Sequence, residues 1–403
     1  MNSRMEIRGR TLSCLKAIRG ASPGLLASCI LLLLLTAFLQ APAAGRIVAI
    51  GDVHGNLDGL VAILQKANLI DQTRHWTGDS ATLVQTGDLL DRGPRSRDVL
   101  DLMMALQKEA PRRNGSVRIS LGNHEVMTMM GDLRYAVPQD YAAFVDSRSE
   151  QRRKAAFQNY SSYQKQHGAS VNEGVWMQAH PAGFIERQEA FSARGAYGRW
   201  LRTLPAVNKV DAAVFLHGGL SPELTSWTVE KINAGVSNEI RAFDKYKQYM
   251  VEKKIALAFF TFDELIAAAR AALDASKAKP QSKEDAGDNA APDNQIIEDF
   301  LQLGGWLSVS ENGPLWFRGY DNWTEDEGER RLSPLMQGLN IKRAVVGHTP
   351  QPNGEIRRRF GGKIFLIDTG MLSSYYPGGK ASALEISKDR IRAIYIDRET
   401  DLN

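Results

Sequence analysis

The 403-residue sequence contains very little cysteine. Its two cysteines, Cys14 and Cys29, both lie near the N-terminus, and residues 44–403 contain none. A chain without cysteine over that length has no disulfide framework and no cysteine nucleophile. The absence therefore excludes every catalytic mechanism that depends on a thiolate.

The sequence also lacks an excess of charge over most of its length. The net charge is +4, from 50 basic and 46 acidic residues. Residues 1–43 hold five of the basic residues and one of the acidic ones, so the remainder has 45 of each. A formally neutral remainder offers no basic surface of the kind that binds nucleic acid, and we predict no nucleic-acid partner.

Long hydrophobic runs are absent except for one, at residues 25–39. A basic segment precedes this run, and Ala41-Pro42-Ala43-Ala44 follows it, which is the layout of a secretory signal. The run is short for a membrane span, which needs about 20 residues. We predict that residues 1–44 are a cleaved signal peptide or an uncleaved anchor. Either reading exports the folded part, to the periplasm or outside the cell, with membrane contact only if the leader is retained.

Three short apolar runs dominate what the sequence does contain. Residues 46–50, 81–85 and 117–121 are typical of buried β-strands. A glycine-flanked polar cluster follows each run: Asp52 and His54, then Asp88, Asp91 and Arg92, then Asn123 and His124. Ligands gather outside the carboxyl ends of strands in open α/β sheets. Oxygen and nitrogen donors without sulfur suit Mn, Fe or Zn, so the clusters predict a site for two metal ions.

The remaining patterns predict an α/β sandwich. Residues 57–69 and 97–108 have the apolar spacing of helices between the first three strands. Further apolar runs at 212–216, 342–346 and 363–367 predict strands, and the first two end at His217 and His348. Residues 383–386 and 391–396 are expected to form a closing hairpin.

Two largely helical insertions are expected within a single catalytic domain spanning 45–403. They cover residues 126–205, which would either shape substrate access or serve as scaffold, and residues 223–300. The polar, proline-containing segment 277–294 is predicted to be a mobile loop.

The motifs together resemble the calcineurin-like metallophosphoesterases, and more narrowly the PPP-type phosphoprotein phosphatases. The shared motifs, in the family's order, are GDVHG at 51–55, GDLLDRG at 87–93, GNHE at 122–125, HGGLSP at 217–222 and GHT at 347–349. LWFRGY at 315–320 and DTGM at 368–371 are most similar to the bacterial Shewanella-like phosphatases. The resemblance implies a β-sandwich of two mixed sheets flanked by helices, in four α/β/β/α layers.

The resemblance also implies a role for each metal ligand. One ion would be held by Asp52 and His54, both ions would share Asp88, and the second ion would be completed by Asn123, His217 and His348. By the same resemblance, two ions so placed would activate a bridging hydroxide, which would attack phosphorus directly without a covalent enzyme intermediate.

Four further residues would act on the substrate in enzymes of this kind. His124 is implied as the general acid for the leaving oxygen, oriented by Asp91. Arg92 would clamp the phosphate through two oxygens, and Arg318 is a candidate second clamp.

The substrate remains open between several classes. The main reading is a phosphorylated Ser, Thr or Tyr of a protein, or a small phosphoester; Tyr375 and Tyr376 would either line the pocket or pack. A second reading is a dinucleoside polyphosphate or nucleotide phosphohydrolase on the same core, whose motif matches residues 87–94. The HGGLSP motif and Asp91 favour the first. A third reading, an inactive metal-binding module, predicts a missing ligand or acid, yet all nine motif positions are intact.

Overall fold

The computed structural model describes residues 45–278, 293–388 and 390–403. The predicted signal peptide or anchor at 1–44, and most of the predicted mobile loop at 277–294, lie outside these residues. Within the described ranges, no helix combines the length and apolar character that crossing a membrane requires.

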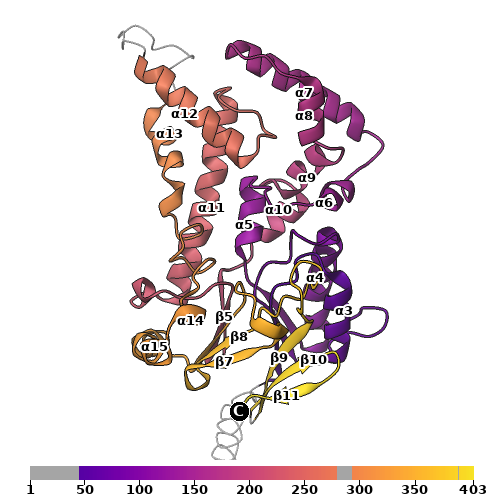
Figure 1. Cartoon of the computed structure of the whole chain (residues 1–403), viewed down its shortest axis with the longest axis vertical. Coiled ribbons are helices and arrows are strands. Elements are labelled where there is room, and N and C mark those ends of the chain that lie inside the picture. Colours follow the sequence, from indigo (N-terminus) through magenta and orange to yellow (C-terminus); the bar gives the residue numbers. More distant parts are fainter. Residues whose placement is uncertain (1–44, 279–292, 389) are drawn as a thin grey trace, which may run out of the picture. The chain divides into compact units, whose positions relative to one another are not determined.

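Two mixed β-sheets form the centre of residues 46–403 (Figure 1). The first has the strand order β11-β10-β9-β1-β2-β3. Its strands are β1 (Ile47–Ile50), β2 (Thr82–Gln85), β3 (Ser116–Ile119), β9 (Ser382–Ile386), β10 (Ile391–Tyr395) and β11 (Glu399–Asp401). Strands β1, β2 and β3 run parallel, whereas β9, β10 and β11 pair antiparallel.

The second sheet has the order β4-β5-β6-β8-β7. Its strands are β4 (Val207–Val210), β5 (Ala213–Leu216), β6 (Arg343–Val346), β7 (Arg357–Arg359) and β8 (Ile364–Leu366). Strands β5, β6 and β8 are parallel, and the two edge strands are antiparallel to their neighbours. Each sheet therefore has a parallel group whose carboxyl ends lie along one edge.

The sheets pack face to face through a buried apolar layer. Its members are buried side chains from both sheets, among them Ala49, Val84, Phe215, Val345, Phe365 and Leu384. Helices α3 (Leu57–Lys66) and α4 (Ser96–Glu109) bury their apolar stripes against the first sheet, and α15 (Glu325–Leu339) packs beside the second. The predicted fold of two mixed sheets flanked by helices is confirmed.

Three strands have no counterpart in the sequence prediction: β4, β7 and β11. Their sequences are VNKV, RRR and ETD. These polar segments lie at or beside sheet edges and gain strand geometry from backbone pairing with a neighbour, which leaves no apolar alternation to detect. The first predicted helix also ends early, at Lys66, because Asn68 takes a left-handed φ of 52°.

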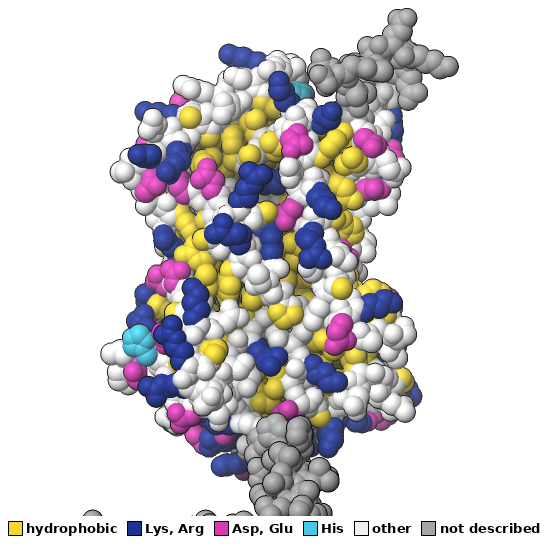
Figure 2. Space-filling view, turned by 180° about the vertical axis from the view of Figure 1, so that it is seen from behind, with side chains coloured by type: hydrophobic (Ala, Val, Ile, Leu, Met, Phe, Trp, Pro, Cys, Tyr) yellow, Lys and Arg dark blue, Asp and Glu magenta, His cyan; other side chains and the backbone are white. Residues whose placement is uncertain are grey.

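The remaining helices form two groups above the sheets in Figure 1. Residues 123–201 form α5 (Asn123–Met130), α6 (Pro138–Ala142), α7 (Ser149–Gln166), α8 (Glu173–Ala179), α9 (Phe184–Phe191) and α10 (Ala196–Leu201). Later residues form α11 (Val229–Glu252), α12 (Phe262–Ala278) and α13 (Asn294–Leu301) of the second group, whereas the short α14 (Gly319–Asn322) lies lower, beside the second sheet. Figure 2 shows basic and acidic side chains mixed over one face, with hydrophobic side chains reaching the surface among the upper helices.

Candidate active site

The six predicted metal ligands come together at the carboxyl ends of the parallel strands. Each of the six is 5% exposed or less, and they are Asp52 and His54 after β1, Asp88 after β2, Asn123 at the start of α5, His217 after β5 and His348 after β6. Both sheets thus contribute to one cluster, although the contributing residues are up to 296 positions apart in sequence.

Asp88 lies at the centre of this cluster. Its Oδ2 is 3.6 Å from His54 Nε2, 3.2 Å from His217 Nε2 and 3.7 Å from His124 Nε2. Two groups of donor atoms, each within 4.8 Å, share this carboxylate: one adds His54 and His124, and the other adds His217 and His348. Asp88 is therefore the residue that the two candidate metal-binding groups have in common.

The ring nitrogens are oriented for metal binding by backbone carbonyls. His54 Nδ1 lies 2.9 Å from the carbonyl oxygen of Leu90, and His217 Nδ1 lies 3.1 Å from that of Thr86. A carbonyl only accepts, so each Nδ1 carries the proton and each Nε2 presents a lone pair. Both Nε2 atoms lie within 3.6 Å of Asp88 Oδ2.

The cluster contains polar atoms that the described protein residues leave unsatisfied. His217 Nε2 faces Asn123 Oδ1 at 2.8 Å and His348 Nδ1 at 3.1 Å, although its own proton is already on Nδ1. His348 Nε2 and Asp368 Oδ2 are buried and have no hydrogen-bond partner among the described residues. Converging lone pairs and orphaned acceptors are costly without a cation. The donor set therefore fits divalent or trivalent metal ions with oxygen and nitrogen ligands.

Burial dominates the electrostatics of the cluster. Burial lowers the pKa of His54 and of His348, so both imidazoles are held neutral. Burial, together with Asp368 and Asp88, raises the pKa of Asp52. Burial also opposes ionisation of Asp88, but the imidazoles of His217, His124 and His54 outweigh it and hold its pKa well below the usual range. Neutral His54 and His348 rings near an ionised Asp88 carboxylate are protonation states that suit metal binding.

The loops that carry the ligands are held in strained backbone conformations. Asp88, Asp91 and Arg92 have left-handed φ values of 57°, 66° and 65°. The buried Glu125 carboxylate compensates by accepting hydrogen bonds of 2.8 Å from the backbone N–H groups of Asp88, Leu89 and Gly122. Glu125 lies within a recognised motif, but its backbone-holding role depends on a loop 36 residues away and has no local sequence signal.

His124 and Asp91 form a buried imidazole–carboxylate pair. His124 Nδ1 donates to Asp91 Oδ2 at 2.9 Å, and His124 Nε2 has no partner among the described residues. Burial lowers the pKa of His124, but the carboxylates of Asp88 and Asp91 raise it by more, so the pKa lies above its ordinary value. The pair therefore favours a protonated His124 ring whose Nε2 is not used by another described residue.

Arg92 is held among aromatic rings beside this pair. Its guanidinium carbon lies 5.1 Å from the ring centre of Tyr135, 4.9 Å from that of Tyr375 and 5.6 Å from that of Tyr376. It donates to His54 Nε2 at 2.8 Å and also to the Tyr376 hydroxyl. Both candidate tyrosines thus contact a site residue, and Tyr135 is a neighbour that the sequence did not reveal.

Arg318 lies at the rim of the site. It is exposed, and its Nη1 donates at 3.0 Å to the His348 carbonyl oxygen and to Thr349 Oγ1. Its contacts are with the loop that carries a candidate ligand, so it lies beside the cluster without entering it.

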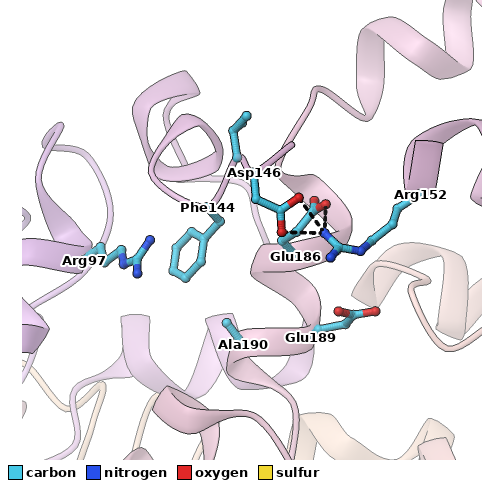
Figure 3. A pocket seen from close by; sticks show the side chains of 8 residues that line it. Arg97, Phe144, Asp146, Arg152, Glu186, Glu189 and Ala190 are labelled. Carbon is cyan, nitrogen blue, oxygen red and sulfur yellow. Dashed lines mark hydrogen bonds and ion pairs between the residues drawn. The ribbon is translucent and has the colours of Figure 1, made fainter. Parts of the chain in front are cut away.

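One cavity adjoins the site and another lies on the helical insertion. An apolar one of about 300 Å³ adjoins Asn123 and is lined by Met127, Met130, Phe262 and Trp316, among others. A more open one of about 460 Å³ lies on the helical insertion, where Arg152 pairs with Asp146 at 3.0 Å and with Glu186 at 2.6 Å (Figure 3). The second cavity shares no lining residue with the ligand cluster.

Comparison with known proteins places the chain among phosphatases. A family model described as calcineurin-like phosphoesterase matches residues 45–352. Shewanella-like protein phosphatase 1 of Plasmodium berghei is 26% identical over 352 residues, covering 87% of this chain and 74% of that protein. Shewanella-like protein phosphatase 2 of Arabidopsis thaliana is 32% identical over 209 residues, covering 49% and 52%. The crystal structure of the cold-active protein-tyrosine phosphatase of a psychrophilic Shewanella species matches with a TM-score of 0.57 at 24% identity, covering 90% and 81%.

Proposed function

The chain belongs to the calcineurin-like phosphoesterase family and is a metal-dependent phosphoester hydrolase, and we propose that it removes phosphate from phosphorylated Ser, Thr or Tyr residues of proteins. The names of its relatives, protein phosphatase and protein-tyrosine phosphatase, support a phosphoprotein substrate. They leave the preference among the three residues to experiment.

The observation that carries the proposal is the buried His124–Asp91 pair with its free Nε2. A phosphomonoester releases an alkoxide or phenoxide, and the phenol of tyrosine has a pKa of about 10. Such a leaving oxygen needs a proton as the bond to phosphorus breaks, and a positioned acid contributes roughly 10²–10⁴-fold to that step. A dinucleoside polyphosphate releases a phosphate group, which leaves readily without a proton. A dedicated acid therefore favours monoesters.

The proposed metal centre uses both sheets. One ion would be held by the group Asp52, His54 and Asp88, and a second by the group Asp88, Asn123, His217 and His348. The absence of sulfur donors favours Mn, Fe or Zn. When bound, two such ions bind phosphate oxygens and lower the pKa of water.

The remaining residues of the site bind and protonate the substrate. Arg92, stacked among tyrosine rings, presents a planar guanidinium that matches two phosphate oxygens. His124 Nε2 gives its proton to the leaving oxygen, and Asp91 stabilises the imidazole orientation in which that nitrogen faces the substrate. Arg318 at the rim adds a second positive charge for the substrate phosphate.

The direct test is hydrolysis by the purified protein, stripped of metal with a chelator and resupplied with Mn²⁺. The substrates are a phosphotyrosine peptide, a phosphoserine peptide and diadenosine tetraphosphate, assayed in parallel. We expect metal-restored release of phosphate from at least one peptide, and the relative rates rank the residue preference. Hydrolysis of the dinucleotide alone would overturn the proposal in favour of a nucleotide phosphohydrolase.

A further inference from the structure

The helical insertion delivers a buried arginine to the acid–base pair. Arg187, on α9, is 2% exposed. Its Nη2 donates at 3.4 Å both to Asp91 Oδ1 and to Thr128 Oγ1. Asp91 is 96 residues away in sequence and lies in the loop after β2. The insertion therefore reaches the catalytic pair directly.

The Arg187 guanidinium lies between aromatic rings and the Asp91 carboxylate. Its guanidinium carbon lies 5.7 Å from the ring centre of Tyr141 and 5.1 Å from that of Phe191. Among the described residues, the only carboxylate within 4.0 Å of the Arg187 guanidinium is that of Asp91. A buried guanidinium is stable only when it is paired and hydrogen-bonded, so the burial of Arg187 depends on this carboxylate.

The Asp91 carboxylate is consequently fixed from both sides. Oδ2 accepts from His124 Nδ1 at 2.9 Å, Oδ1 accepts from Arg187, and the backbone N–H of Asp91 donates to Ser96 Oγ at 3.1 Å. We propose that Arg187 is a positioning residue, which holds Asp91 and thereby holds the His124 ring in the orientation that protonates the leaving oxygen. This inference rests on the proposed function, because it assigns His124 as the acid.

Helix α9 is held in place by α7, another helix of the insertion. Glu186, the residue before Arg187, accepts from Arg152 of α7 at 2.6 Å, and Figure 3 shows this ion pair at the wall of the open cavity. The residues that line the cavity from α9 are Glu186, Glu189 and Ala190, which share one helical face. The position of Arg187 is thus set by packing within the insertion, and not by the sheets.

The chemical step makes the role of Arg187 measurable. The ester P–O bond breaks, its electron pair goes to the leaving oxygen, and the proton of His124 Nε2 neutralises that oxygen. A water molecule forms the new P–O bond, and one of its protons restores His124. Misplacing the acid therefore slows poor leaving groups and spares good ones, whereas general damage to the fold slows both alike.

The experiment compares p-nitrophenyl phosphate, a substrate with a good leaving group, with phenyl phosphate, whose leaving phenol has a pKa of about 10. For Arg187→Met we expect kcat on phenyl phosphate to fall by about 10–100-fold, as for other residues that orient catalytic groups, with KM and metal content unchanged. The kcat on p-nitrophenyl phosphate should change far less. Arg187→Lys, which keeps the charge but loses the planar fork, should recover part of the rate on phenyl phosphate.

Arg202→Met is the matched control. Arg202 is less deeply buried than Arg187 and pairs with Asp244 at 2.7 Å, and among the described residues it forms no hydrogen bond or ion pair with Asp91. The Arg202→Met variant should change kcat on both substrates by the same factor.

If Arg187→Met does not fold, Thr128→Val serves in its place, because it removes the second acceptor of Arg187. It should also slow phenyl phosphate more than p-nitrophenyl phosphate, by a smaller factor than Arg187→Met. Equal losses on both aryl phosphates, or no loss, in the variants that fold would overturn the inference. Failure of the wild-type protein on phosphopeptides, with activity on aryl phosphates, would count against the proposed substrate alone.

Discussion

The strand-end loops and the helical insertion contribute to the same site by different physical routes. In the loops, each candidate ligand follows a four-residue strand within a few positions, as Asp52 follows β1 and His217 follows β5. In the insertion, Arg187 reaches Asp91 only because α9 packs where it does. Residues that would bind metal are therefore marked locally in the sequence, whereas Arg187, which contacts Asp91 of the His124–Asp91 pair, has no local mark.

The largest effect is expected at Asp88, where the two ligand groups meet. Asp88→Asn keeps the shape of the side chain but replaces a carboxylate oxygen with a donor, so neither cation retains its shared ligand. We expect kcat/KM to fall by about 10³-fold or more, a loss of several kcal/mol of transition-state stabilisation. Metal analysis of the purified variant should show both ions depleted. A variant with full metal content would contradict the central place given to Asp88.

His124→Asn tests whether His124 is a proton donor or a metal ligand. As an acid, His124 contributes roughly 10²–10⁴-fold to kcat on poor leaving groups, and this contribution should be lost. Metal content should stay near that of the wild-type protein, because all six proposed metal ligands are still present in this variant. The variant is informative because the His124 ring lies in one group of candidate donor atoms with His54 and Asp88. Loss of metal would identify His124 as a ligand.

Arg318→Met tests the rim of the site, where a smaller effect is expected. Arg318 is exposed, and interactions of an exposed charge are worth about 0.2–1 kcal/mol, or up to about fivefold in affinity. KM should rise within that range while kcat is retained, as steady-state kinetics on a phosphopeptide would measure. A fall in kcat as large as that of His124→Asn would instead place Arg318 in the chemical step.

Trp176→Ala tests whether the tip of the insertion is separable from the chemistry. Trp176 is 3% exposed and packs on His180, with ring centres 4.1 Å apart. Its truncation should destabilise the packing of α7 and α8 by about 3–5 kcal/mol, measured as faster hydrogen exchange in those helices. Turnover of p-nitrophenyl phosphate should stay near the wild-type rate. Loss of that activity would show that the insertion supports the ligand cluster itself.

Much of the fold was predictable from periodicity and turn residues. The buried strands β1, β2, β5 and β6 and the helix α4 lie where the apolar patterns indicated. The edge strands β4, β7 and β11 were missed because polar segments become strands through backbone pairing alone. Among site residues, Tyr135 and Arg187 were missed because their contacts with Arg92 and Asp91 arise from packing between distant segments.

The sequence by itself marked the candidate ligands, because each is a polar residue that follows a buried strand and the motifs match those of the metallophosphoesterases. Only the tertiary structure showed that ligand residues from both sheets lie around Asp88. It also showed that Glu125 accepts hydrogen bonds from the strained loop after β2, and that Arg187 of the insertion contacts Asp91. Short-range patterns record which face of an element is buried. They do not record which distant charge is buried against it, since that pairing depends on how helices pack over the sheets.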